Sequence, residues 1–312
     1  MIGLEHVTKR FGQVEAVSDL SLHVPGGMIV GLLGQNGAGK TTTLNMLTGY
    51  YPPTSGRVLI DGMDMLLQPR ECKRRIGYLP EQPPLYDEMT VREYLRFCCA
   101  LKEVVRRDVR RHVEEIIGLC GLGEMAERTL GRLSRGYRQR AGIAQALCGD
   151  PPVLVLDEPT VGLDPKQVVE IRALIGEIGK THTVLFSSHL LGEVQQLCRR
   201  VVILNRGRLC YQGDGNARGD RMTLRARIAG SGKALLTSVR DLPCVEDAQL
   251  LGRDGAGACE IRIRCREQAP SPQEALFRLL CRLDMPLLSL REERDSLEEI
   301  FLRVTSGDEH NA

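Results

Sequence analysis

The segment Gly34-Gln35-Asn36-Gly37-Ala38-Gly39-Lys40-Thr41 carries the strongest signal in this chain. Its glycine, four intervening residues, glycine, lysine and threonine fit the pattern of the phosphate-binding P-loop. The apolar residues 28–33 before it read as a short strand, and residues 40–47 after it read as a helix. Because strand, loop and helix follow one another as this motif requires, we predict a site for a nucleoside triphosphate.

The chemistry of the loop supports this interpretation. Glycines let the backbone turn its N–H groups inward around phosphate oxygens, and the positive end of the following helix attracts the same anion. Lys40 supplies a point charge for the β- and γ-phosphates, and the Thr41 hydroxyl suits Mg²⁺. A glycine-rich turn without a ligand is the alternative, but three successive threonines, 41–43, are mediocre helix formers that folding alone gives little reason to place there. The predicted triphosphate-binding residues are Gly34, Gln35, Asn36, Gly37, Ala38, Gly39, Lys40, Thr41 and Thr42.

Composition limits the classes of partner. The 42 Lys and Arg residues nearly balance 40 Asp and Glu residues, giving a net charge of +2, so no overall field draws the chain onto nucleic acid or anionic lipid. The basic runs 70–75 and 106–111 are more typical of solvated helix faces than of a nucleic-acid patch. We therefore expect no nucleic-acid partner.

The cysteines and the apolar runs limit the compartment. Eleven cysteines are scattered without a Cys-x-x-Cys pair, which argues against a disulfide framework and a zinc site, and Cys98, Cys99, Cys148 and Cys198 fit apolar core patterns. Met1 leads directly into a strand pattern, so we expect no leader, and no apolar run approaches the ~18 residues that cross a bilayer. A membrane role would thus require a partner.

The order of elements predicts an α/β fold. Strand patterns at 3–8, 14–24, 28–33, 57–60, 75–79, 153–156, 183–186 and 201–204 alternate in the later part with helices, which favours a wound sheet. Residues 90–150 are mostly helical, with a capping box at Thr90 and Glu93, a Gly-rich turn at 118–123 and a new helix after Ser134, and read as an inserted helical subdomain. A linker at 213–216 separates domain 1–215 from a small α+β domain over 220–312. In the second domain we expect strands at 222–228 and 260–265 and helices at 272–283 and 296–304, the last with a Ser296/Glu299 capping box.

A pair of acids completes the candidate site. The continuous apolar strand 153–156 ends in Asp157 and Glu158. We expect this strand to lie beside the P-loop strand, so that Asp157 can hold Mg²⁺, usually through water, and Glu158 can polarise an attacking water. Ordinary helix-start charges are a weaker explanation, because no cap precedes Pro159.

Four further motifs, in one order, make residues 28–190 resemble the ATP-binding subunits of ABC transporters. They are Gln82 in Gly77-Tyr78-Leu79-Pro80-Glu81-Gln82, the signature-like Leu133-Ser134-Arg135-Gly136-Tyr137, the loop Val161-Gly162-Leu163-Asp164, and Ser187-Ser188-His189. The resemblance implies ATP and Mg²⁺ as cofactors, with Thr41, Gln82 and Asp157 at the metal. It implies Glu158, His189 and Lys40 as catalytic residues, and Phe11 as the aromatic that stacks on adenine, with a plain core role as the alternative.

The same resemblance implies a dimer. In this family Ser134, Arg135, Gly136 and Tyr137 would bind the ATP held by the P-loop of a second subunit, and Asp164 would lie at the dimer seam while also capping a helix. Ser134 as a plain N-cap is the alternative for that residue taken alone. The partner subunit would be a copy of this chain or a related ATPase, and Gln82 would also serve an integral-membrane permease.

Two departures from the usual signature indicate a branch of the family. Arg135 replaces a glycine and Tyr137 a glutamine, and we expect ordinary helical geometry at Arg135 because a positive φ would cost about 1 kcal/mol. The variant resembles drug-export, gliding-motility and sodium-efflux ATPases, as does the tail 296–302. We therefore expect an exporter ATPase, peripheral on the cytoplasmic face of the cell membrane. An importer ATPase, a soluble ABC ATPase acting on ribosomes or nucleic acid, and a nucleotide sensor with little turnover are the alternatives.

Overall fold

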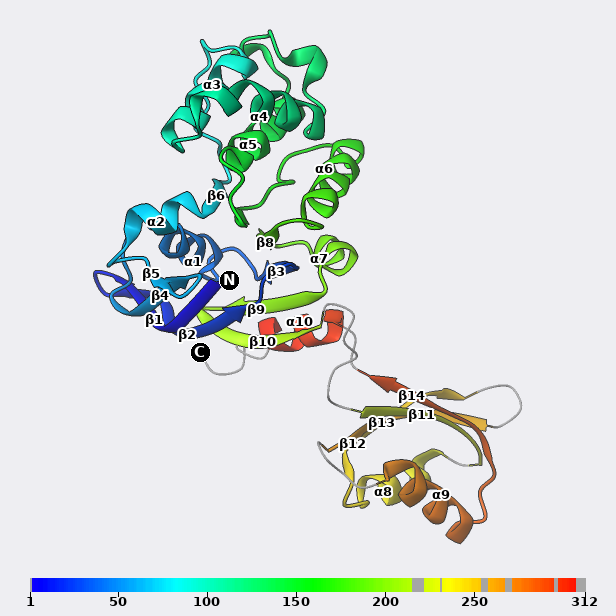
Figure 1. Ribbon diagram of the computed structural model, residues 1–312. Helices are drawn as coiled ribbons and strands as arrows, with labels where there is room; N and C mark the ends of the chain where they lie inside the picture. Colours follow the sequence, from blue (N-terminus) through cyan, green and yellow to red (C-terminus); the bar gives the residue numbers. More distant parts are fainter. Residues whose placement is uncertain are drawn as a thin grey trace. The chain divides into compact units, whose positions relative to one another are not determined.

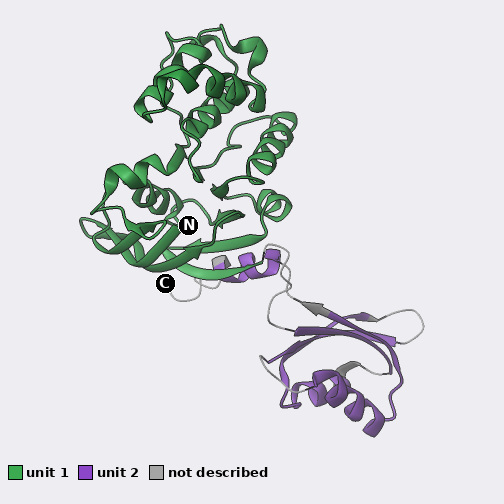
Figure 2. Ribbon diagram, viewed as in Figure 1, with its two compact units in different colours: residues 1–216 green, residues 217–312 purple. Residues whose placement is uncertain are grey.

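The computed structural model describes residues 2–214, 222–230, 232–253, 258–266, 271–294 and 297–306. The chain divides into two compact units, residues 1–216 and 217–312 (Figure 2). The predicted linker overlaps this division: residues 213–214 end a strand, and residues 215–216 lie outside the described residues. Each unit is described by itself below.

Unit 1 contains an antiparallel sheet in the order β2-β1-β4-β5. Apolar side chains from one face of this sheet join those of the central sheet in a single core that includes Leu4, Val17 and Val58. The strands are β1 (Ile2–Phe11), β2 (Val14–Val24), β4 (Ser55–Ile60) and β5 (Met63–Asp64).

The central sheet of unit 1 has the order β10-β9-β3-β8-β7-β6, with every neighbouring pair parallel except β10 with β9. Its strands are β3 (Ile29–Leu33), β6 (Ile76–Leu79), β7 (Val153–Leu156), β8 (Thr183–Ser188), β9 (Arg200–Asn205) and β10 (Arg208–Asp214). The expectation that the acid-bearing strand lies beside the P-loop strand is wrong, because β8 lies between β7 and β3. The carboxyl ends of all three strands still meet at one edge of the sheet.

Helices complete unit 1. Helices α1 (Lys40–Leu47), α2 (Pro69–Arg74), α6 (Pro165–Ile178) and α7 (Leu191–Leu197) follow the strands. Helices α3 (Val91–Leu101), α4 (Arg106–Leu119) and α5 (Arg135–Leu147), with 3₁₀ turns at Gly123–Met125 and Leu130–Arg132, gather apart from the antiparallel sheet (Figure 1). The Thr90/Glu93 capping box is present, and helix α3 buries one face formed by Val91, Tyr94, Leu95, Cys98 and Cys99. The predicted turn at 118–123 starts two residues later than expected, since α4 continues through Gly118 to Leu119.

Unit 2 is a β-α-β-β-α-β arrangement with one antiparallel sheet in the order β12-β13-β11-β14. Its elements are β11 (Met222–Ala229), α8 (Gly232–Arg240), β12 (Val245–Arg253), β13 (Ala258–Cys265), α9 (Pro272–Arg282) and β14 (Leu287–Arg294), followed by α10 (Leu297–Ser306). Leu224, Ile261 and Leu276 belong to a core that the sheet forms with α8 and α9. The predicted strands and helices are observed, and the Ser296 half of the last capping box lies outside the described residues.

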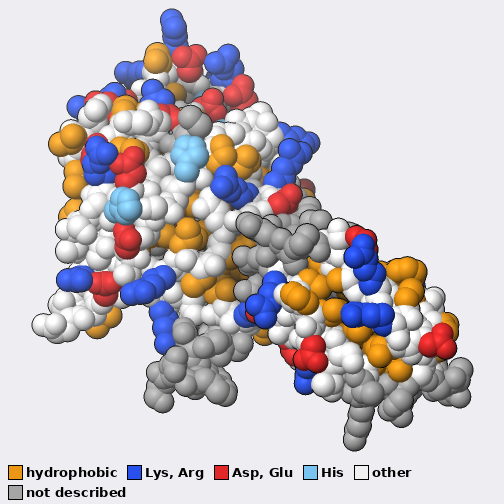
Figure 3. Space-filling view, turned by 90° about the horizontal axis from the view of Figure 1, so that it is seen from below, with side chains coloured by type: hydrophobic (Ala, Val, Ile, Leu, Met, Phe, Trp, Pro, Cys, Tyr) orange, Lys and Arg blue, Asp and Glu red, His pale blue; other side chains and the backbone are white. Residues whose placement is uncertain are grey.

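Basic and acidic side chains are mixed on the surface, in line with their nearly equal numbers in the sequence. On the face seen in Figure 3, basic and acidic side chains are interspersed. The basic run 106–111 lies on α4, and its arginine side chains are exposed. Within the described residues, none of the helices combines the length and apolar character needed to span a bilayer.

Candidate functional site

The P-loop lies where β3 passes into α1. Helix α1 begins at Lys40, and its N-cap Gly39 has a φ of 96°. A side chain there would be strained by that φ and would approach the Ala16 carbonyl to 2.7 Å, so glycine is required. The loop borders a cavity of about 560 Å³ lined by residues 35–42 together with Glu158, Val161, His189 and Arg206. Every predicted phosphate-binding residue except the buried Gly34 lines this cavity.

Lys40 is held in an extended position under the loop. Its Nζ donates to the Gly34 carbonyl at 2.7 Å and to the Gln35 carbonyl at 3.3 Å. The same atom lies 3.4 Å from Oε1 of Glu158, and the Lys40 side chain is 6% exposed. A buried ammonium group in a fixed position can stabilise an anion without a free-energy cost of reorganisation. Phosphoryl transfer requires electrostatic stabilisation of this kind.

The Ser187 hydroxyl positions the pair of acids, although the sequence motif Ser187-Ser188-His189 gave no sign of this role. The Ser187 hydroxyl donates to Oδ1 of Asp157 at 2.6 Å and accepts from the Glu158 backbone N–H at 2.8 Å. All three residues are buried. The hydroxyl at the end of β8 therefore fixes both acids at the end of the neighbouring strand β7.

Asp157 retains one oxygen for a ligand. Its Oδ2 is buried and has no hydrogen-bond partner within the described residues. Burial raises the pKa of the Asp157 carboxyl, while the Ser187 hydroxyl and the nearby Thr41 hydroxyl act in the opposite direction. A buried carboxylate oxygen without a donor is unfavourable unless a cation or water joins it, so the arrangement suits a divalent metal.

Glu158 and His189 line the P-loop cavity and contact each other. Nδ1 of His189 lies 2.9 Å from Oε2 of Glu158, and the histidine side chain is 40% exposed while the glutamate side chain is 10% exposed. The Glu158 backbone has a φ of 46°, an unfavourable conformation for a non-glycine residue that costs about 1 kcal/mol or more. The structure thus brings the predicted base and the predicted histidine together at the P-loop.

A buried glutamate, missed in the sequence, joins the loops that carry these two residues. Oε2 of Glu193 accepts from the Thr160 hydroxyl at 2.8 Å and from the Ser188 hydroxyl at 2.9 Å. Glu193 is 5% exposed, although it lies in the first turn of α7. The available signal for Glu193 was an acidic residue four positions after His189. Acids are common in the first turn of a helix, however, and nothing in the sequence pattern indicated that this one is buried.

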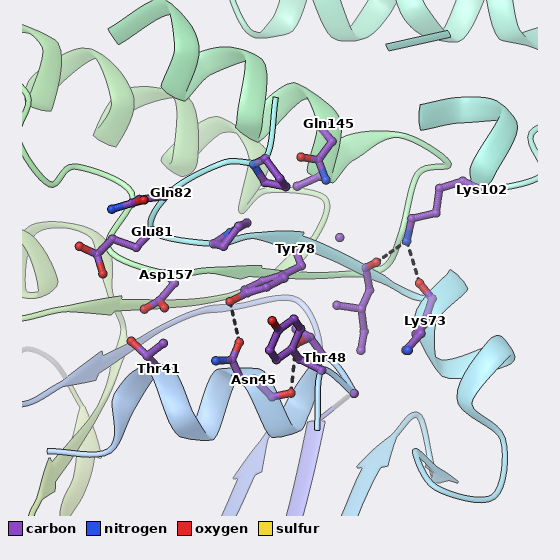
Figure 4. A pocket seen from close by; sticks show the side chains of 17 residues that line it. Thr41, Asn45, Thr48, Lys73, Tyr78, Glu81, Gln82, Lys102, Gln145 and Asp157 are labelled. Carbon is purple, nitrogen blue, oxygen red and sulfur yellow. Dashed lines mark hydrogen bonds between the residues drawn. The ribbon is translucent and has the colours of Figure 1, made fainter. Parts of the chain in front are cut away.

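The predicted metal residues lie together in a neighbouring cavity of about 720 Å³. Thr41, Gln82 and Asp157 all line it, and Figure 4 shows Thr41 and Asp157 facing each other below Glu81 and Gln82. Thr41 and Glu81 also line the P-loop cavity, so the two cavities adjoin. Glu81 is a further acid at the site, and its charge contributes to raising the pKa of Asp157.

Phe11 does not lie among the residues that line the P-loop cavity. Its ring is 46% exposed and meets Tyr51 edge to face at a centroid distance of 5.5 Å. The alternative of a plain core residue is wrong, since nearly half of the side chain is open to solvent. Adenine stacking on Phe11 stays a prediction.

The signature residues lie elsewhere in unit 1. Ser134, Gly136 and Tyr137 line a third cavity of about 440 Å³ with Asp164, and none of the signature residues lines either cavity beside the P-loop. Ser134 is the N-cap residue of α5, yet within the described chain its hydroxyl makes no capping hydrogen bond. Asp164 caps α6 as expected, accepting from the Gln167 N–H at 2.9 Å. Arg135 has helical geometry, as predicted.

Comparisons with known proteins agree with this site. A family model described as ABC transporter matches residues 17–161. The chain is 40% identical to an uncharacterised ABC transporter ATP-binding protein of Bacillus subtilis, YxlF, over 69% of this chain and 71% of that protein. It is 33% identical to the bacitracin transport ATP-binding protein BcrA of Bacillus licheniformis over 96% of both chains.

The fold has the same relatives. The structure of a dimeric bacterial ABC transporter cassette is similar with a TM-score of 0.63 and 27% identity, over 70% of this chain and all of that chain. The match with BcrA extends over nearly the whole chain, so the similarity includes unit 2 as well as the ATP site. The chain belongs to the ABC transporter family, as an ATP-binding protein with the ABC ATPase fold.

Proposed function

We propose that this chain hydrolyses ATP within a dimer of ATP-binding subunits and thereby drives a separate membrane permease that exports its substrate. The observation that carries the proposal is the convergence of three side chains on the P-loop. Glu158 lies 3.4 Å from Lys40 and 2.9 Å from His189, at the end of the loop where a γ-phosphate would lie. This arrangement provides a base, a fixed cation and a hydrogen-bonding imidazole in one place.

Each of these residues has a distinct part in the proposed reaction. The Glu158 carboxylate orients and deprotonates the attacking water, because its buried position keeps it close to the reaction centre. Lys40 neutralises charge on the β- and γ-phosphate oxygens, and the remaining predicted P-loop residues hold the phosphates with their backbone N–H groups. His189 would hold the γ-phosphate through its ring N–H, with Glu158 on the other side of the ring.

Thr41, Asp157 and Gln82 would hold Mg²⁺ with oxygen ligands. The buried Oδ2 of Asp157 and the facing Thr41 hydroxyl suit a hard cation, and Gln82 lines the same cavity. When bound, the ion neutralises charge on the phosphate oxygens and aligns them. Ser187 keeps Asp157 in place for this contact through its 2.6 Å hydrogen bond.

The separation of the P-loop from the signature residues supports the dimer. Ser134, Gly136 and Tyr137 border a cavity of their own, so a second subunit is needed to bring a signature segment to the ATP of this P-loop. The related bacterial cassette has been solved as a dimer. We propose a homodimer or a heterodimer with a related ATPase, with Asp164 at its seam.

The exported substrate would pass through the permease and not through this chain. The cavity bordered by Gln82 is the proposed docking site of the permease, in line with the family role of that glutamine. Similarity to BcrA, a bacitracin transport protein, over 96% of both chains favours export of a drug-like or peptide substrate. The subunit would then be cytoplasmic and peripheral on the inner face of the membrane.

Affinity purification from detergent-solubilised membranes tests the assignment. The tagged full chain is purified beside an otherwise identical D157N chain, and the accompanying proteins are identified by mass spectrometry. We expect a stoichiometric polytopic membrane protein with both chains, together with ATP hydrolysis only with the unmodified chain. Ribosomal proteins or nucleic-acid enzymes in place of the membrane protein would contradict the transporter assignment.

A further inference from the structure

Arg135, one of the two residues that depart from the usual signature, contacts the loop that follows Glu158. Its Nη2 donates to the Val161 carbonyl at 3.0 Å. The guanidinium also lies against Gly162: a Cβ built on that glycine would be 2.2 Å from Cζ and Nη2 of the arginine. Gly162 has a φ of 68°, so its missing side chain serves both the turn and the arginine. The two positions are therefore complementary although they come from different segments.

The contacted loop is part of the candidate active site. Val161 lines the P-loop cavity with Glu158, and its N–H donates to the Glu158 carbonyl at 3.1 Å. The loop holds Glu158 at a φ of 46°, a conformation that persists only where neighbouring contacts fix it. On its buried side Thr160 is fixed by Glu193, and on its exposed side Val161 is fixed by Arg135.

The contact does not place Arg135 in the nucleotide-binding set. Ser134, Gly136 and Tyr137 line the signature cavity, whereas Arg135 is absent from the residues lining that cavity. Its hydrogen bond to the Val161 backbone carbonyl uses one N–H of the planar guanidinium group. A charged donor to a carbonyl is stronger than a neutral one and suits the task of fixing a loop.

We propose that Arg135 is a positioning residue for Glu158, acting through Val161 of its own chain, and not a ligand of the ATP held by the partner subunit. Through this bond the amino end of α5, which carries the signature, is tied to the loop that carries the catalytic base. In a dimer the arginine would thus link the state of one ATP site to the geometry of the other. The inference rests on the proposed function only where it concerns turnover.

Steady-state kinetics of the full chain test the proposal. R135M removes the donors with little change in bulk, R135K restores one donor, and R132M removes an exposed arginine in the preceding turn as a matched control. We expect R135M to lower kcat at least about fivefold with KM within about twofold of the unmodified chain, because misplacing a catalytic group affects the reaction more than binding. R135K should recover most of that kcat, and R132M should match the unmodified chain.

A double-mutant cycle locates the effect at the Arg135–Gly162 contact. G162A would displace the guanidinium, so the R135M/G162A chain should lose little more kcat than G162A alone. Losses that multiply independently would contradict the proposal. A raised KM with unchanged kcat in R135M would also overturn it, by placing Arg135 on the nucleotide.

Hydrogen exchange provides a measurement that needs no turnover. Amides of residues 158–164 should exchange faster in R135M than in the unmodified chain and R132M, without nucleotide. Equal exchange in all three would overturn the positioning role even if ATPase activity is high. Conversely, faster exchange in a chain without ATPase activity would support the contact and count against the proposed function.

Discussion

Nδ1 of His189 lies 2.9 Å from Oε2 of Glu158, which links the residue after β8 to the second residue after β7. The two strands are neighbours in the central sheet, and their carboxyl ends carry the two side chains to the same edge. The imidazole can thus orient the base and present its other nitrogen to a phosphate.

Replacing His189 by alanine should lower kcat while leaving ATP binding largely intact. Removing a hydrogen-bond donor aimed at developing charge typically costs about 100-fold in rate, whereas the P-loop residues that hold the phosphates remain. Steady-state ATPase assays and equilibrium binding of a fluorescent ATP analogue separate the two effects. His182, which lies 3.1 Å from Asp150 outside the cavity linings described above, is the matched control, and H182A should retain turnover. Full turnover in H189A would contradict a catalytic role for His189.

Replacing Ser187 by alanine should destabilise the fold and weaken the affinity for Mg²⁺. The change removes the acceptor of the buried Glu158 N–H and the donor to Asp157, and a buried polar group left unpaired costs about 1–3 kcal/mol. Chemical unfolding should show this loss, and ATPase titrations should need more Mg²⁺ for half-maximal rate. S187T keeps a hydroxyl and serves as the control. Unchanged stability in S187A would mean that water replaces the hydroxyl at both partners.

Replacing Glu193 by alanine should lower kcat although the residue lies outside the P-loop cavity. The Thr160 and Ser188 hydroxyls would lose their shared acceptor, and the loops carrying Glu158 and His189 would no longer be joined. E193Q keeps a carbonyl oxygen of the same reach and should retain more activity than E193A. Glu177, an exposed glutamate on α6, provides the control E177A. If E193A and E177A have the same kcat, the hydrogen bonds by which Glu193 joins the two loops make no contribution to turnover.

Thiol labelling should distinguish two cysteines from the other nine. Cys210 and Cys281 are exposed, and the remaining nine are buried. Burial raises the pKa of the Cys120 thiol to about 12 and that of Cys265 to about 11, so these groups stay protonated as the pH rises from 7 to 9. Labelling of the native chain with iodoacetamide should therefore modify the two exposed thiols first and leave Cys120 and Cys265 unmodified over this pH range, and mass spectrometry of the peptides measures it. Rapid modification of Cys120 at pH 7 would contradict the burial of this residue.

Much of the fold could be predicted because its signals are local. The P-loop, the apolar run 153–156 and the capping box at Thr90 each occupy a few consecutive residues, and the structure has all three. Helices α3 and α6 bury apolar residues spaced three and four apart, because a period of 3.6 places such residues on one face. Strands β12 and β14 were not predicted because their apolar residues do not alternate regularly, and helix α8 was missed because it spans only 9 residues.

The spatial order of strands could not be predicted from the same signals. Adjacency of β7 to β3 was expected because their ends share a ligand, but β8 intervenes, and sequence order does not fix which strands pair in a wound sheet. The contacts of Ser187, Glu193 and Arg135 depend on that order. Each joins segments at least 26 residues apart or closes a turn whose geometry is set by tertiary packing. The roles of such residues can be recognised only once the positions of the neighbouring loops are known.

The most direct test of the central claim compares the unmodified chain with E158Q. Single-turnover hydrolysis and light scattering are measured on both chains with ATP and Mg²⁺. The account predicts at least a 100-fold slower hydrolysis in E158Q, as expected for loss of a general base, together with ATP binding and a persistent ATP-dependent dimer. Hydrolysis by E158Q at a rate close to that of the unmodified chain would contradict the assignment of Glu158 as the base and, with it, the proposed mechanism.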